Sequence, residues 1–386
     1  MGTPLHLAVA LDGTGWHPAS WREPSARPAD TLTPRYWTDL VSEAERGLLD
    51  FVTIEDGLTL QSDHPFRPDD RTDRVRGRLD AVLIAARVAP RTRHIGLVPT
   101  IVTTHTEPFH ASKAIATLDY VSTGRAGVRV QVASRRDAAA HFGRRHLPED
   151  RAALSTELFS EATDYVEVLR RLWDSWEDDA EIRDVATGRF IDRNKLHYID
   201  FEGATFSVKG PSITPRPPQG QPVVAALGHV DAAYQLIAGS TDVGFVTPHS
   251  GAEVTALVDA IAALRPTDVP PVRVFADLVV FLDDTPSAAA ARRDRLDELA
   301  GAEYRSDAEI FAGTPGQLAD LLQAWQEAGA AGFRLRPASL PRDLEQITDV
   351  LVPDLQRRGL FREAYESSTL RGLLGLPRPA NRYTTV

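Results

Sequence analysis

The sequence predicts an α/β protein built as one (β/α)8 TIM barrel that spans residues 1–386. Short apolar runs alternate with longer segments of helical periodicity, which is typical of βαβ units and a parallel sheet. The predicted strands are largely apolar, as expected when both faces of a sheet are covered. With 42% apolar and 25% charged residues, the composition is that of an ordinary globular protein. Barrels of this kind often exceed ~250 residues within one domain.

The first half of the chain supplies four strand–helix units. Segment 34–49 illustrates the helical signal, because Trp37, Leu40 and Ala44 recur at helical spacing and would share one face. The predicted strands are 5–11, 51–54, 95–99 and 127–132, and the helices that follow them are 34–49, 79–88, a segment around 110–118 and 158–176.

The second half supplies four more strands, and an insertion precedes it. Residues 178–212 are rich in charged and aromatic side chains without a clear period, so we interpret them as an insertion that acts as a lid over the barrel mouth. The predicted strands are 223–227, 243–246, 272–282 and 332–335, and the predicted helices are 231–238, 253–264, 287–299 and 315–328.

Composition excludes several classes of protein. The net charge of −11 is spread along the chain, which disfavours nucleic-acid binding. The absence of cysteine excludes disulfides, thiolate nucleophiles and Cys-ligated zinc or iron–sulfur sites. No run of ~18 apolar residues predicts a membrane span. The N-terminal segment reads as a first strand rather than a signal peptide, so we expect a cytoplasmic protein.

Polar and aromatic side chains follow six of the predicted strands. In a (β/α)8 barrel the carboxyl ends of the strands meet at one mouth, where the active site lies. Six loops that carry such groups to one mouth predict a small-molecule site there. In chain order the candidates are Asp12, Gly13, Trp16 and His17, then Glu55 and Asp56, then Thr100, Thr103, Thr104 and His105, then Ser134, Arg135 and Arg136, then Gly228 and His229, and finally Thr247, Pro248 and His249.

Other kinds of site are disfavoured. The candidate histidines lack the i, i+4 helical spacing of a metal-binding motif, so no metal site is predicted. Glu55 and Asp56 are adjacent at a strand end and point to opposite sides, so we expect one to face the mouth and the other a neighbouring helix. The chain has neither a G-x-S-x-G nucleophile motif nor a Gly-rich phosphate loop.

Long motifs in a fixed order carry a family resemblance. They are LHLAVALDGTGWHPASWREP from residue 5, FVTIEDGL from residue 51, LVPTIVTTHTEPFHASKAIATLDYVSTGRAG from residue 97, and the block 313–382. The chain closely resembles the bacterial luciferase-like flavin monooxygenases, in the subgroup that oxidises nitrilotriacetate, dibenzothiophene sulfone and a streptogramin precursor. The resemblance runs over nearly the whole chain and implies a luciferase-like barrel.

The resemblance also implies a cofactor and a set of contacts. Reduced FMN would come from a separate flavin reductase and react with oxygen to oxidise a small organic substrate, and the protein would be a homodimer or larger. The residues that match the family's flavin contacts are Asp56, Thr103 and Thr104 at the isoalloxazine, with Gly228 and His229 near the phosphate. Our candidates for substrate contact or proton transfer are His17, His105 and His229.

Departures from the family pattern cluster where the flavin phosphate is expected. The family's Thr-Ser pair after the fourth strand is Val132 and Ala133 here, and its His and Tyr on the next helix align with Ser155 and Phe159. Val230 stands where the family has a small hydroxyl residue. Each hydrogen bond lost to a charged group costs about 1.5–3 kcal/mol. Three hypotheses stay open: reduced FMN in a rearranged phosphate site, a deazaflavin, or no flavin.

The flavin-free hypothesis has two forms. One is an enzyme on the same barrel that performs acid/base chemistry on a natural-product-like substrate with His17, Asp56 and His229. The other is a non-catalytic subunit that pairs with an active barrel. The phosphate-site departures favour both forms, whereas the Asp56, Thr103 and Thr104 set favours a flavin enzyme.

Overall fold

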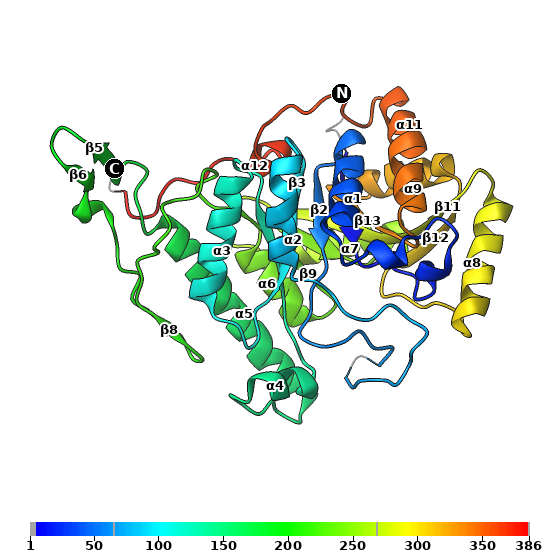
Figure 1. The fold of residues 1–386 in the computed structure, drawn as a ribbon, viewed down its shortest axis with the longest axis horizontal. Coiled ribbons are helices and arrows are strands. Elements are labelled where there is room, and N and C mark those ends of the chain that lie inside the picture. The colour runs from blue at the N-terminus through cyan, green and yellow to red at the C-terminus, as the bar shows by residue number, and fades with distance from the viewer. Residues whose placement is uncertain (1–4, 65, 268, 385–386) are drawn as a thin grey trace.

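The computed structural model describes residues 5–64, 66–267 and 269–384, and their core is a closed parallel barrel (Figure 1). Each neighbouring pair of its strands is parallel, and the pairing of β10 with β11 closes the ring. The predicted (β/α)8 fold is therefore confirmed. The barrel strands are β1 (His6–Leu11), β2 (Phe51–Ile54), β3 (Gly96–Val102), β4 (Gly127–Gln131), β9 (Val223–Leu227), β10 (Val243–Val246), β11 (Arg273–Leu282) and β13 (Gly332–Pro337).

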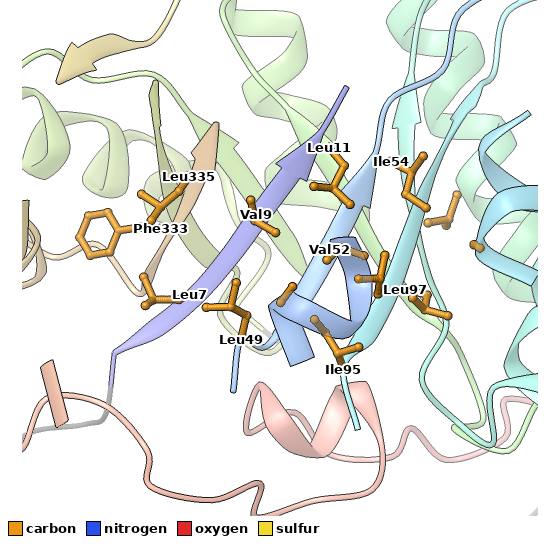
Figure 2. Packing of buried hydrophobic residues seen from close by; sticks show 14 of the residues in the cluster. Leu7, Val9, Leu11, Leu49, Val52, Ile54, Ile95, Leu97, Phe333 and Leu335 are labelled. Carbon is orange, nitrogen blue, oxygen red and sulfur yellow. The ribbon is translucent and has the colours of Figure 1, made fainter. Parts of the chain in front are cut away.

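Side chains alternate between the helix-facing layer and the barrel interior, because successive residues of a strand point to opposite faces. Val9 pairs in register with Val52, and Leu11 with Ile54, and these side chains pack together on the side of the sheet that the helices cover (Figure 2). Ala8 lies in a separate cluster with ring side chains such as Phe51, Phe245 and Phe275. Leu370 and Leu374 complete that cluster, so the C-terminal helix plugs the amino end of the barrel.

Eight helices that the sequence predicted surround the barrel, and several are capped by their own sequence. Thr314 and Gln317 form a complete capping box at α9. Asp150 caps α5, which therefore begins at Arg151, ahead of the predicted start at residue 158. The helices are α1 (Pro34–Arg46), α2 (Ala81–Val88), α3 (Pro108–Val121), α5 (Arg151–Asp174), α6 (Asp231–Ser240), α7 (Gly251–Leu264), α8 (Pro286–Ala300) and α9 (Pro315–Glu327), with α4 (Arg136–Phe142), α10 (Arg342–Gln346), α11 (Val352–Arg357) and α12 (Leu370–Leu373) in addition. No helix in the described ranges is both long and apolar enough to cross a bilayer.

One strand that joins the main sheet was not predicted. β12 (Glu309–Gly313) pairs parallel with the carboxyl half of β11, from Leu278 opposite Glu309 to Leu282 opposite Gly313. β10 pairs only with the amino half of the same strand. The extra length of β11 therefore offers an edge that β12 covers, and it brings the preceding residue Asp307 to the barrel mouth.

The insertion at residues 178–212 lies outside the barrel. It contains β5 (Glu181–Asp184), β6 (Arg189–Ile191), β7 (Phe201–Glu202) and β8 (Ser207–Val208). Figure 1 shows the β5–β6 hairpin beside the C-terminus at the upper left, whereas α4 lies at the lower edge of the molecule. Phe201 packs with Val168 and Leu172 of α5. Because α5 runs back from the mouth to the amino end of the barrel, the segment that follows it starts at the amino end, and its role as a lid stays a prediction.

Another segment lies at the mouth. The loop that joins β2 to α2, described at residues 57–64 and 66–80, runs along the same lower edge of the molecule as α4 in Figure 1. Members of this loop line four of the cavities at or beside the mouth, including Phe66, Gln61 and Arg78. This loop, which we did not single out from the sequence, therefore contributes to the lining of the mouth.

Candidate active site

A buried network of ion pairs occupies the centre of the barrel near its mouth. The Nε atom of Arg334 donates to Oδ1 of Asp277 at 2.9 Å, and the Nε atom of Arg336 donates to Oδ2 at 2.9 Å. Both guanidinium groups and the carboxylate are essentially inaccessible to solvent. Burial opposes ionisation of Asp277, but the charges of Arg334 and Arg336 hold its pKa below the usual value.

The network continues across the barrel to β4. Arg129 pairs with Glu55, and its guanidinium also donates to Thr100 Oγ1 at 3.0 Å and to Gln131 Oε1 at 2.8 Å. Burial lowers the pKa of Arg129 to about 10, against the attraction of Glu55. Glu55 thus faces the barrel interior, as expected for one member of the Glu55–Asp56 pair.

Asp56 is the other member, and it faces α2 and the mouth. Its Oδ1 accepts from the backbone N–H of Gly57 at 2.7 Å, and its Oδ2 accepts from the N–H of Ala81, at the start of α2, at 2.9 Å. Burial raises the pKa of Asp56, while these two hydrogen bonds lower it. Asp56 also lines a mouth cavity of about 320 Å³, so it can both fix the loop and contact a ligand.

The two threonines expected at the flavin ring form hydrogen bonds that link the end of β3 to the end of β4. Thr103 donates from Oγ1 to the carbonyl of Gln131 at 3.2 Å, and Thr104 Oγ1 accepts from the N–H of Ala133 at 3.0 Å. Both residues are buried, and neither lines the 320 Å³ cavity. They set the separation of β3 from β4 at the mouth.

The three candidate histidines lie apart from one another. His17 is buried, its Nε2 lies 3.0 Å from Asp297 Oδ1, and its Nδ1 accepts from the N–H of Ala19. Burial lowers the pKa of His17, against the pull of Asp297. Because both ring nitrogens are used within the protein, His17 serves to hold the loop after β1.

His105 and His229 differ in their surroundings. His105 adopts a φ of 70°, stacks on Phe142 at 5.3 Å and has no partner for Nε2 among the described residues. Burial lowers its pKa. His229 lies at the mouth, with Nε2 3.2 Å from Asp307 Oδ2 and Nδ1 3.2 Å from Thr247 Oγ1. In the described ranges, no group of three or more acidic or imidazole side chains is placed to hold a metal ion.

A cavity of about 540 Å³ at the mouth lies where the flavin phosphate was expected. It opens between the amino ends of α5 and α6, next to the carboxyl ends of β4 and β9. It shares Gln131, Val132 and Ser134 with the 320 Å³ cavity, so the two form one cleft. Its lining is Phe66, Arg129, Val130, Gln131, Val132, Ser134, Arg151, Leu154, Ser155, Leu158, Phe159, Ala162, Ala226, Leu227, His229, Val230, Ala233 and Leu236.

The residues present do not fit the phosphate group of FMN in the way the family resemblance implied. Val132, Phe159 and Val230 contribute only apolar surface to this wall. Asp231 adds a carboxylate to the first turn of α6, which counters the attraction of that helix end for an anion. A phosphate dianion needs several directed donors. The side-chain donors that remain include Arg151 and Ser155 on α5, Ser134 after β4 and His229 after β9.

Gly228 has a packing role beside this cavity. A Cβ atom there would lie 2.8 Å from the ring of Tyr234 and 2.9 Å from Ile237. The glycine therefore lets the end of β9 approach α6 closely. This contact explains the residue without a ligand.

Sequence reasoning missed several residues that line the cavity. Arg151 and Leu154 fell outside the predicted helix, and Phe66, Ala233 and Leu236 follow no strand directly. Asp150 was the signal for the true start of α5, because Asp is a favoured N-cap residue. The loop and α6 residues had no local signal, since their position depends on the closed barrel.

Fold and site together define a (β/α)8-barrel protein with a small-molecule cleft at the carboxyl ends of its strands. The family model described as luciferase-like monooxygenase matches residues 16–332, so the chain belongs to that family. It is 33% identical to N-acetyl-S-(2-succino)cysteine monooxygenase of Bacillus subtilis (strain 168), with 98% of each chain covered. It is 30% identical to nitrilotriacetate monooxygenase component A of Aminobacter aminovorans, with 98% of this chain and 97% of the relative covered. The EDTA monooxygenase structure from Chelativorans sp. BNC1 superposes with a TM-score of 0.83 at 25% identity, covering 97% of this chain and 99% of that one.

Proposed function

We propose that the protein is the oxygenating component of a two-component monooxygenase, which takes reduced FMN from a separate reductase and oxidises a small organic substrate. The observation that carries this proposal is the family match over residues 16–332 together with the mouth cleft around Asp56. The names of the relatives support it, because both are monooxygenases of small organic molecules and one is called component A. A homo-oligomeric state remains our prediction.

The chain's own contribution would be binding, orientation and exclusion of water. In such enzymes the flavin supplies the oxygen chemistry. Asp56 offers a carboxylate at the cleft, Thr103 and Thr104 hold the strand ends around it, and residues 57–62 help to line it. His229 borders the larger cavity, and His105 offers an unpartnered imidazole nitrogen near the end of β3.

One observation favours a second candidate function. The apolar wall in place of a phosphate cradle favours a flavin-free barrel, either an acid/base enzyme or a partner subunit. Asp56 suits an acid/base role, since burial raises its pKa. His17, Asp56 and His229 line three different cavities, and Nε2 of His17 is engaged with Asp297. We therefore rank the flavin enzyme first.

An anaerobic titration of the purified protein with reduced FMN, followed by calorimetry, tests the proposal. Micromolar or tighter binding supports the monooxygenase function. Absence of binding at high micromolar FMN contradicts it, and a titration with a reduced deazaflavin then decides between that cofactor and a flavin-free barrel.

A further inference from the structure

We propose that the 540 Å³ cavity between α5 and α6 binds the apolar body of a small organic anion, whose charged end lies at Arg151. This inference deepens the proposed function, because it names the substrate class of the same mouth cleft. Its test measures ligand binding and requires no enzyme turnover, so the result is independent of whether the protein uses flavin.

The walls of the cavity suit an apolar body. Leu154, Leu158 and Phe159 line it from α5, and Ala233 and Leu236 line it from α6. The strand side adds further aliphatic side chains from β4 and β9. Apolar ligand surface that leaves water for such a wall gains about 25 cal/mol per Å². A volume of about 540 Å³ is within the usual range for a small-molecule site.

The charges around the cavity favour an anion. Its eighteen lining residues include Arg129, Arg151 and His229, and no carboxylate. Arg129 is already paired with Glu55, and His229 lies against Asp307. The cation that is left is therefore Arg151.

Arg151 lacks a carboxylate partner in the described part of the chain. Its guanidinium lies 4.5 Å from the ring centroid of Phe66, and the adjacent Asp150 accepts from the N–H of Ala153 instead. Three arginines close to it in sequence each have a carboxylate partner: Arg135 with Asp137, Arg136 with Glu149 and Arg145 with Glu161. An unpaired guanidinium at the rim of an apolar cavity is complementary to a carboxylate, sulfonate or phosphate group.

Two serine hydroxyl groups line the same cavity as Arg151. Ser134 and Ser155 line the cavity, and neither hydroxyl has a hydrogen-bond partner among the described residues. Ser155 lies one helical turn after Arg151 on α5, so both side chains share a face. The ligand's anionic end would accept from these groups while its apolar body extends between Leu158 and Leu236.

Calorimetric titration with hexanoate, octanoate and decanoate tests the apolar wall. We expect the affinity to rise about three- to fourfold per added methylene until the cavity is full. Inorganic phosphate, which has the charge without the apolar body, should show no comparable binding. An affinity that is independent of chain length, or phosphate binding as tight as that of octanoate, would overturn the proposal.

Two variants, each lacking one positive charge, test the role of Arg151 at the rim of the cavity. Arg151→Gln should weaken octanoate about two- to fivefold, since the site is exposed, and leave neutral 1-octanol unchanged. Arg136→Gln removes an exposed charge nearby that does not line the cavity, and should change neither. An equal loss of octanoate binding in both variants would assign the effect to net charge and contradict the role of Arg151.

Substitutions that change the volume of the cavity test whether the ligand binds there. Ala233→Phe should abolish binding of both octanoate and 1-octanol, and circular dichroism and thermal unfolding show whether it folds. If it does not fold, Phe159→Ala enlarges the cavity and should shift the best chain length to a longer acid. An unshifted optimum would place the probe elsewhere.

Competition with flavin separates this inference from the proposed function. Octanoate binding with no flavin binding supports the cavity and removes the flavin function. Simultaneous binding of octanoate and reduced FMN supports both. Mutual displacement, with FMN affinity lost in Arg151→Gln, would assign the cavity to the flavin phosphate and overturn the inference.

Discussion

Nε2 of His229 lies 3.2 Å from Oδ2 of Asp307, which joins the end of β9 to the segment before β12. Asp307 also pairs with Arg336 of β13, with Nη1 and Oδ1 2.6 Å apart. Three separate strands of the mouth are thus tied through one carboxylate. Its pKa is held well below the usual value, because the contacts with His229 and Arg336 outweigh burial, which acts in the opposite direction.

Asp307→Asn should destabilise the protein by about 1 kcal/mol at neutral pH, a modest amount because the carboxylate is 42% exposed. The folded-state pKa is depressed, so this stabilisation is present above the unfolded pKa of about 4 and is lost as pH falls below it. Urea unfolding of both proteins at pH 7 and pH 4 measures the difference. A deficit that grows on acidification would contradict the assignment.

Asp277→Asn should cost about 3–5 kcal/mol, because Arg334 and Arg336 would keep their charges in a site without solvent. The pKa of Asp277 is also depressed, so the deficit should shrink as pH falls below about 4. Asp284→Asn, at an exposed position after the same strand, is the control and should stay within about 0.5 kcal/mol of wild type. Thermal unfolding measures both variants.

Asp56→Ala and Thr104→Val should each weaken binding of reduced FMN, by about tenfold if one hydrogen bond to the ring or its frame is lost. Asp80→Ala is a matched control, since Asp80 caps α2 through Leu83 but does not line the cleft. It should lower stability without changing the Kd. Unchanged affinity in both test variants would remove the isoalloxazine from this part of the mouth.

Reduced riboflavin should bind within about threefold of reduced FMN, because the side chains of Phe159 and Val230 give a phosphate no hydrogen-bond donor on this wall. Phe159→Tyr places a hydroxyl on that wall and should improve FMN about tenfold while leaving riboflavin unchanged. Parallel anaerobic titrations measure the two ratios. A wild-type preference for FMN of a hundredfold or more would show that other residues hold the phosphate.

Sequence patterns found all eight barrel strands, since each is a buried apolar run whose hydrophobicity does not depend on its partners. β12 was missed because Glu309–Gly313 is half-buried and forms only against the long edge of β11. α4 was missed because a seven-residue helix carries little periodic signal.

Candidate site residues were found by position and only partly by role. Because Asp56 and His229 directly follow predicted strands, we expected them at the mouth, where they lie. Barrel topology brings the carboxyl ends of the strands together independently of the loop conformations. The commitment of His17 to Asp297 could not be foreseen, since the partner lies 280 residues away.

Local sequence was enough to predict the barrel, the end of the barrel where a site is expected and the loss of polar side chains at Val132, Phe159 and Val230. These properties follow from local hydrophobicity, strand direction and residue type. The three-dimensional arrangement was needed to show that those residues line one cavity, that Arg151 at its rim has no carboxylate partner among the described residues and that residues 57–62 help to line the mouth. Each depends on side chains distant in sequence, which the closed barrel brings within contact distance.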